Sequence, residues 1–200
     1  MTSSFFKLIL KFFILIFILL LMVCCLIPSI NTATGKVYFS GDYVWPLPGY
    51  SYISSYFGFR NSPTAGASSY HSGIDIPAPS GTPILAVHSG IVTFCSWGAG
   101  GGYTIVVENT DVGLSFSYCH VSPIFIISRG DNIRAGDVIS SVGPKNVYGI
   151  SNNPYKDSNG LPTNGATTGS HLHLTIKKDG KAVNPLDYIS SSSSDSSLDS

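Results

Sequence analysis

Two contrasting patterns of apolar residues divide the chain. All sixteen residues of Phe12–Ile27 are apolar, and Lys11 alone separates this run from Leu8–Leu10. A helix that crosses a membrane needs about 20 predominantly apolar residues, and a lysine near its end can extend toward the headgroups. The first 30 residues therefore predict one N-terminal transmembrane or signal helix.

The residues that flank this run predict its orientation. Lys7 and Lys11 precede it, so the positive-inside rule places the N-terminus in the cytoplasm and the rest of the chain outside. Asn31-Thr32-Ala33 matches a signal-peptidase site poorly, which favours an uncleaved anchor over a cleaved signal peptide. Cys24 follows a bulky valine, which argues against a lipid-attachment site. We expect an extracytoplasmic, membrane-anchored protein, secreted if the segment is cleaved.

The remainder of the chain has a different pattern. Short β-branched and aromatic runs alternate with Gly, Pro, Asn and Ser, and no stretch has helical periodicity. We expect a mainly β, antiparallel domain over 45–189, after a linker over 31–44 and before a disordered serine-rich tail over 190–200. The predicted strands are Ile84–Val87, Ile91–Ser96, Tyr103–Glu108, Leu114–His120, Val138–Val142 and His171–Lys177.

Composition excludes several classes of function. The chain has 11 basic and 11 acidic residues and lacks the basic stripe that nucleic-acid binding requires, so we expect no nucleic-acid partner. Its single glutamate, Glu108, has no neighbouring histidine, which excludes the H-E-x-x-H zinc motif. A G-x-S-x-G nucleophile motif is also absent from the sequence. Cys95 and Cys119 are expected to be buried and unpaired, because a β-meander would place one strand between them.

Histidines carry the main functional signal. In His171-Leu172-His173-Leu174 a strand would place both histidines on one face and both leucines toward a core. His71 and Asp75 lie four residues apart in a segment whose Gly and Pro residues argue against a helix. His120 ends a predicted strand, whereas the fifth histidine, His88, is expected at the surface.

Together these motifs predict a hydrolytic metal site. Two histidines and one aspartate can hold Zn²⁺ with an open fourth position, and two further histidines remain to handle protons. Each motif alone has a structural explanation, such as an exposed strand histidine or a loop aspartate. Their combination is what favours catalysis.

The chain resembles the M23 family of zinc metallopeptidases, the lysostaphin- and LytM-like peptidoglycan endopeptidases, from Trp45 to Ile189. The resemblance rests on Ser54-Ser55-Tyr56-Phe57-Gly58-Phe59-Arg60, the H-x-x-x-D of His71 and Asp75, Pro83-Ile84-Leu85-Ala86, Gly90-Ile91-Val92, His120, Arg134-Ala135-Gly136-Asp137-Val138-Ile139, the H-x-H of His171 and His173, and Val183-Asn184-Pro185.

This resemblance implies a site and a substrate. His71, Asp75 and His173 would bind Zn²⁺, and His120 and His171 would flank the attacking water. The substrate would be the stem peptides or cross-bridges of bacterial peptidoglycan. The fold would be the antiparallel β-sheet of LytM and lysostaphin.

One segment departs from the family pattern. Gly143 and His171 are separated by a long stretch rich in Asn, Gly, Pro, Ser and Tyr, where family members usually have about ten residues. A loop of this length is more often functional or disordered than inert. We expect it to form one wall of a substrate groove, with Tyr148 and Tyr155 and the side chains of Asn152, Asn153, Asn159 and Asn164 along it. We also expect replacement of residues 147–165 to leave stability nearly unchanged, and a mobile surface loop is the alternative.

Two other functions compete with hydrolysis. A catalytically silent, wall-binding or regulatory module of the same fold would usually lack zinc ligands, whereas His71, Asp75 and His173 are all present. A lipoyl- or biotin-carrier module shares the pattern of Arg134 to Ile139, but the chain has no modifiable lysine in a Met-Lys-Met or Asp-Lys-Ala motif.

Overall fold

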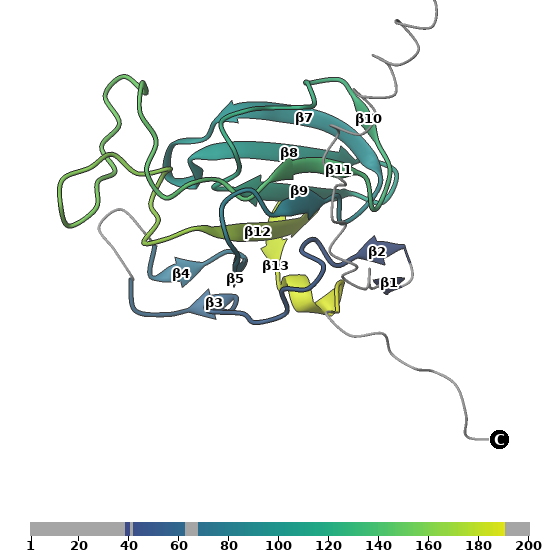
Figure 1. Ribbon diagram of the computed structural model, residues 1–200. Coiled ribbons are helices and arrows are strands. Elements are labelled where there is room, and N and C mark those ends of the chain that lie inside the picture. The colour runs from purple at the N-terminus through teal and green to yellow at the C-terminus, as the bar shows by residue number, and fades with distance from the viewer. Residues whose placement is uncertain (1–38, 41, 63–67, 191–200) are drawn as a thin grey trace, which may run out of the picture. The chain divides into compact units, whose positions relative to one another are not determined.

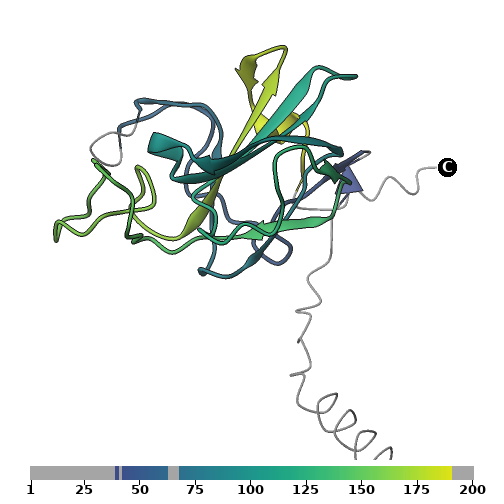
Figure 2. The ribbon, with the colours of Figure 1, turned by 90° about the horizontal axis from the view of Figure 1, so that it is seen from above.

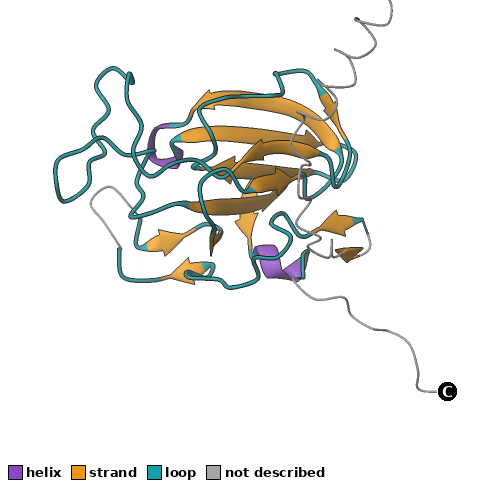
Figure 3. Ribbon diagram, viewed as in Figure 1, coloured by secondary structure: helices purple, strands orange, loops and turns teal. Residues whose placement is uncertain are grey.

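Antiparallel strands make up nearly all of the regular structure (Figure 1, Figure 3). The computed structural model describes residues 39–40, 42–62 and 68–190, all within one unit that spans residues 36–200. Its strands are β1 (Phe39–Ser40), β2 (Tyr43–Val44), β3 (Gly58–Phe59), β4 (Tyr70–His71), β5 (Ile74–Pro77), β6 (Pro83–Leu85), β7 (Gly90–Trp97), β8 (Tyr103–Asn109), β9 (Leu114–Cys119), β10 (Asn132–Ile133), β11 (Val138–Ser141), β12 (His171–Lys178) and β13 (Lys181–Val183). Two short 3₁₀ turns, η1 (Ala99–Gly101) and η2 (Pro185–Asp187), complete the described elements.

The main sheet has the order β10-β7-β8-β9-β12-β13. Strand β12 pairs with three other strands. Strand β9 lies along one side of it, and β5 followed by β13 lies along the other. The turn between β12 and β13 contains Asp179 and Gly180, both with positive φ, as a type I′ hairpin turn requires. The predicted mainly antiparallel β fold is therefore confirmed, and the six predicted strands correspond to β6, β7, β8, β9, β11 and β12.

Alternation along β12 anchors the sheet to the core. Leu172, Leu174 and Ile176 are fully buried, and burial of such side chains stabilises a fold by about 1.5–3 kcal/mol each. The alternate residues, His171 and His173, lie on the opposite face and are only half-buried. Packing of the leucines thus fixes which face the histidines occupy.

Ordered structure begins earlier than the sequence predicts. Val44, in the predicted linker, is fully buried and its N–H donates to the carbonyl of Val87 at 2.8 Å, so ordered packing begins ahead of Trp45. The predicted membrane helix within residues 1–30 lies outside the described residues, as does the predicted tail over 190–200 apart from Ser190. Within the described part of the chain, no helix is long and apolar enough to cross a membrane.

Some local predictions are confirmed and others are wrong. Strands β7, β8 and β9 form the expected meander, and Cys95 and Cys119 are unpaired, although they are half-buried rather than buried. His88 is not a surface residue. It is buried with its ring stacked on Phe116, the ring centroids lying 5.6 Å apart at an interplanar angle of 7°.

The segment between β11 and β12 extends beyond one end of the main sheet, the end at which β3 and β4 also lie (Figure 1, Figure 2). This segment is locally structured. Isolated bridges join Asn146 to Thr163 and Lys156 to Pro162. Its two arms therefore run side by side and return the chain to the start of β12.

Candidate metal centre

Three strands supply the candidate metal ligands. His71 ends β4, Asp75 lies in β5 and His173 lies in β12, where it pairs directly with Asp75. Between the first two, Gly73 passes so close to the carbonyl of Leu174 that any Cβ would collide with it. Glycine thus allows the turn that brings both members of the H-x-x-x-D motif to β12 without a helix.

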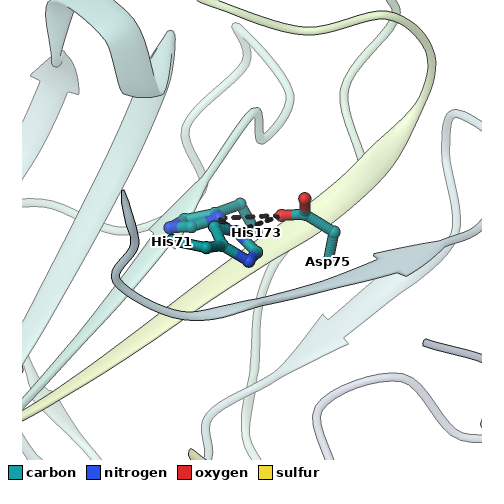
Figure 4. Close-up of side chains that lie close together, drawn as sticks. All are labelled: His71, Asp75 and His173. Atoms are coloured by element: carbon teal, nitrogen blue, oxygen red, sulfur yellow. Dashed lines mark hydrogen bonds and ion pairs between the residues drawn. The ribbon is translucent and has the colours of Figure 1, made fainter. Parts of the chain in front are cut away.

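The donor atoms of these residues converge on one point (Figure 4). The Oδ1 atom of Asp75 lies 3.1 Å from Nε2 of His71 and 2.8 Å from Nδ1 of His173. The two nitrogens lie 2.9 Å apart. Ligands of a tetrahedral ion with bonds of about 2.0 Å are themselves separated by roughly 3.3 Å, so a few tenths of an ångström of relaxation would admit Zn²⁺.

Hydrogen bonds on the far side of each ring fix which nitrogen faces the centre. Nδ1 of His71 lies 2.8 Å from the carbonyl of Tyr56, which can only accept, so Nδ1 carries the proton. Nε2 of His173 lies 2.9 Å from Oγ1 of Thr175, which can accept its proton. Two nitrogen lone pairs and a carboxylate oxygen then face one another, an arrangement that a cation stabilises.

The remaining oxygen of Asp75 is held from the other side. Nη1 of Arg60 donates to Oδ2 at 3.0 Å and also contacts the hydroxyl of Ser55. Burial alone would raise the pKa of Asp75, but the neighbouring rings of His171, His173 and His71 lower it well below its usual value. The carboxylate is therefore ionised, as a metal ligand must be.

A second pair of histidines lies beside the trio. The ring centroids of His120 and His171 are 4.6 Å apart, and Nε2 of His171 lies 3.5 Å from Oδ1 of Asp75. Each of these rings donates Nδ1-H to a backbone carbonyl. For His120 the acceptor is Asn164, at 2.6 Å, and for His171 it is Gly169, at 2.9 Å.

His120 is held in an unusual state. Its φ of 59° is in the left-handed region, which costs free energy for a residue other than glycine and is found most often at functional sites. Burial, together with the neighbouring His171 and His173, lowers its pKa from 6.5 to about 3. The ring is therefore neutral at pH 7, with a proton on Nδ1 and a lone pair on Nε2.

All five residues line one open cavity of about 880 Å³. Its lining includes Ser54, Ser55, Arg60 and Tyr70 from one part of the chain and residues 166–170 from another. The prediction that the long segment borders the cavity holds only for these last five residues. Residues 144–165, including the tyrosines and asparagines assigned to the groove, do not line it.

Sequence reasoning thus missed three supporting residues. In the sequence, Arg60 appears only within the motif over residues 54–60, Thr175 only within the predicted strand His171–Lys177, and Asn164 only as an expected groove contact. The strand period does place Thr175 next to His173. The contacts of Arg60 and Asn164 span long sequence separations, so no local pattern reveals them.

Comparison with known proteins assigns the family. The model of Peptidase family M23 matches residues 69–185, more than half of the chain. The chain belongs to peptidase family M23. The resemblance inferred from the sequence is confirmed, and the site lies within the matched residues apart from the wall around Arg60.

Individual relatives agree with this family. The DD-carboxypeptidase/endopeptidase Mpg of Neisseria meningitidis is 34% identical over 137 residues, which cover 68% of this chain but 27% of Mpg. Stage II sporulation protein Q of Bacillus subtilis is 35% identical over 88 residues, 44% of this chain and 24% of that protein. The M23 chain thus corresponds to about a quarter of the length of each.

A solved structure supports the fold. The catalytic domain of lysostaphin from Staphylococcus simulans aligns over 70% of this chain and 91% of its own, with a TM-score of 0.54 and 24% identity. At this identity the likeness concerns the fold alone. The expected lysostaphin-type β architecture is confirmed for the described residues.

Proposed function

We propose that this M23 protein is a zinc-dependent endopeptidase that hydrolyses peptide bonds in the stem peptides or cross-bridges of bacterial peptidoglycan. One observation carries the proposal: three metal-donor atoms converge beside the rings of His120 and His171, and all five residues line one open cavity. A wall-binding module has no need of His120 and His171 in this arrangement.

The metal would be held by Nε2 of His71, Oδ1 of Asp75 and Nδ1 of His173. When bound at such a site, Zn²⁺ acts as a Lewis acid that polarises a carbonyl and makes hydroxide available at neutral pH. The donor set of two imidazoles and one carboxylate is typical of catalytic zinc, which keeps a position open. Arg60 and Thr175 orient two of the ligands.

His120 and His171 would move the protons of the reaction. Both rings donate Nδ1-H to a fixed carbonyl, so each presents Nε2 as the exchangeable site. A neutral imidazole can accept a proton from the attacking water and return it to the leaving amine. Such general acid and base catalysis typically contributes about 10²- to 10⁴-fold.

Substrate and location rest on other observations. Mpg is named as a carboxypeptidase and endopeptidase, and lysostaphin as an antimicrobial peptidase, and the open cavity has room for an extended peptide. The apolar run within residues 1–30 supports an extracytoplasmic enzyme on a membrane anchor, with the domain over 45–189 facing the wall. Neither composition nor site favours nucleic acid.

Digestion of purified walls tests the proposal. Peptidoglycan of several cross-link chemistries is incubated with the zinc-loaded protein, and released peptides are identified by mass spectrometry. We expect new amino termini with the parent protein and none with His173→Ala, because one ligand is lost. His120→Ala and His171→Ala should keep zinc but lose most hydrolysis.

The silent-module alternative gives a different result. In that case the parent protein would sediment with walls without releasing peptides, and His120→Ala would bind equally well. Near-normal cleavage by both His120→Ala and His171→Ala would instead disprove their assignment as proton carriers.

A further inference from the structure

Asn164 uses every polar group it has, although it is fully buried. Its N–H donates to the carbonyl of Lys145 at 2.8 Å. Its side-chain Oδ1 accepts from the N–H of Tyr103 at 2.8 Å, and Nδ2 donates to the carbonyl of Val121 at 3.0 Å. Its own carbonyl accepts Nδ1-H of His120.

These contacts join the two backbone segments that pair with each other at His120. Tyr103 begins β8, and Val121 is the residue that follows His120. The amide of Asn164 therefore ties the two backbone segments that flank His120, and its carbonyl holds the ring between them. A carboxylate lacks the donor, and an alanine lacks both groups.

The backbone around His120 also depends on close packing. The N–H of His120 donates to the carbonyl of Gly101 at 2.7 Å, and its carbonyl accepts from Gly143 at 2.9 Å. Any Cβ at Gly102 or Gly143 would collide with Asn164. The left-handed φ of His120 is maintained because its neighbours leave no alternative.

We propose that Asn164 is a positioning residue for the reaction, which holds His120 as the Nδ1-H tautomer with Nε2 directed to the cavity. The inference rests on the proposed function for the role of His120. It assigns to the unusual segment before β12 a part in the reaction that its length alone does not suggest. No described residue offers Nε2 of His120 a hydrogen bond, so that atom stays available to substrate or water.

The chain provides a matched control for an Asn164 variant. Asn153 lies in the same segment, and its amide also makes two backbone hydrogen bonds. Nδ2 donates to Thr163 at 2.9 Å and Oδ1 accepts from Tyr155 at 3.0 Å. Asn153 has no contact with His120, so Asn153→Ala removes similar bonds without disturbing the ring.

Kinetics on a soluble peptide that contains the intact bond cleaved in the wall digestion form the first test. We expect Asn164→Ala to lower kcat by about tenfold to hundredfold with little change in KM, because small misplacement of a reacting group is costly. Zinc content should equal that of the parent. Asn153→Ala should remain within about twofold. Equal kcat values in Asn164→Ala and Asn153→Ala, or a change in KM without a change in kcat, would overturn the proposal.

The second test uses the parent protein and does not depend on hydrolysis. Long-range ¹H–¹⁵N spectra of the zinc-loaded protein report which ring nitrogen of His120 carries the proton. We expect a protonated Nδ1, and in Asn164→Ala, if it folds, a mixture of tautomers. A protonated Nε2 in the parent would overturn the inference. Absent wall hydrolysis with the expected tautomer would refute the proposed function and leave the hydrogen-bonding role of Asn164 supported.

Discussion

The two halves of the candidate site are built differently. His71, Asp75 and His173 lie on paired strands, and the register of β5 with β12 alone brings two of them together. His120 and His171 instead depend on carbonyls of the segment between β11 and β12. Under the proposed function, the sheet would therefore determine whether a metal can bind, and the segment would determine how protons are handled.

That segment is itself divided. Residues 163–170 are largely buried or line the cavity, whereas 148–161 form an exposed tip in which Tyr148 is 68% exposed. Val147 donates to the carbonyl of Pro162 at 3.1 Å, so the tip begins and ends at adjacent residues. The difference suggests that the two parts can be separated by shortening the chain.

The largest expected effect is a difference in stability and hydrolysis between two shortened proteins. Replacing 148–161 with a short Gly-Asn bridge should change stability little, because loop entropy changes by only about 0.6 kcal/mol for each doubling of loop length. Replacing 147–165 also removes Asn164, which leaves the N–H of Tyr103 and the carbonyl of Val121 without their partner. Each unpaired group should lower stability by about 1–3 kcal/mol. We expect at least about a hundredfold loss of hydrolysis only in the second protein.

Denaturant unfolding and wall digestion measure both effects. The buried hydrogen bonds of Asn164 predict a loss of stability when 147–165 is replaced, whereas loop length alone predicts almost none. The comparison would fail if both shortened proteins were equally stable and equally active.

Zinc affinity should respond to the sheet half alone. Thr175→Val keeps the shape of the side chain but removes the oxygen that accepts Nε2-H of His173. Loss of such an outer contact typically weakens metal binding about 10- to 100-fold.

Competition with a chromogenic chelator measures this affinity. Ser72→Ala is the control, since the hydroxyl of Ser72 contacts that of Thr175 at 3.4 Å but makes no hydrogen bond to the side chain of a proposed ligand. An unchanged zinc affinity in Thr175→Val would show that the ligand orientation does not depend on this contact.

The two halves also differ in how well sequence predicts them. The alternation of His171 to Ile176 and the H-x-x-x-D spacing identify candidate metal ligands, because strand period and turn chemistry are local. The strand positions follow for the same reason. The choice of His173 over His171 comes from the resemblance to the M23 family and from the donor atoms that converge in the structure. Other contacts join residues far apart in sequence: His88 packs against Phe116, and Asn164 hydrogen-bonds to Tyr103 and Val121. Composition and periodicity therefore cannot predict them.

Acid should lower the stability of the folded protein through His120, which belongs to the second half of the site. Its pKa lies near 3 in the folded protein and near 6.5 when unfolded. Between these values only the unfolded chain binds the proton, so stability falls as pH decreases from 6.5 toward 3 and is unaffected above this window. The slope contributed is at most about 1.4 kcal/mol per pH unit.

Urea unfolding of the metal-free protein from pH 7 to pH 4 measures this slope. His120→Asn removes the titrating ring, and its stability should fall less steeply with acid than that of the parent. Parallel profiles would mean that His120 is not the group responsible.

The smallest effect is expected at the tip. Asp157 accepts backbone N–H groups of Asn159 and Leu161, both at 3.0 Å, and pairs with Lys145 at 3.2 Å. Burial acts against ionisation, but these hydrogen bonds lower its pKa to about 2. Asp157→Asn should speed hydrogen exchange at Asn159 and Leu161 because the amide is a weaker acceptor. Wall hydrolysis and zinc affinity should stay within about twofold of the parent, since the tip does not line the cavity. A matching fall in hydrolysis would contradict this separation of the tip from the site. Residues 148–161 would then contribute to catalysis.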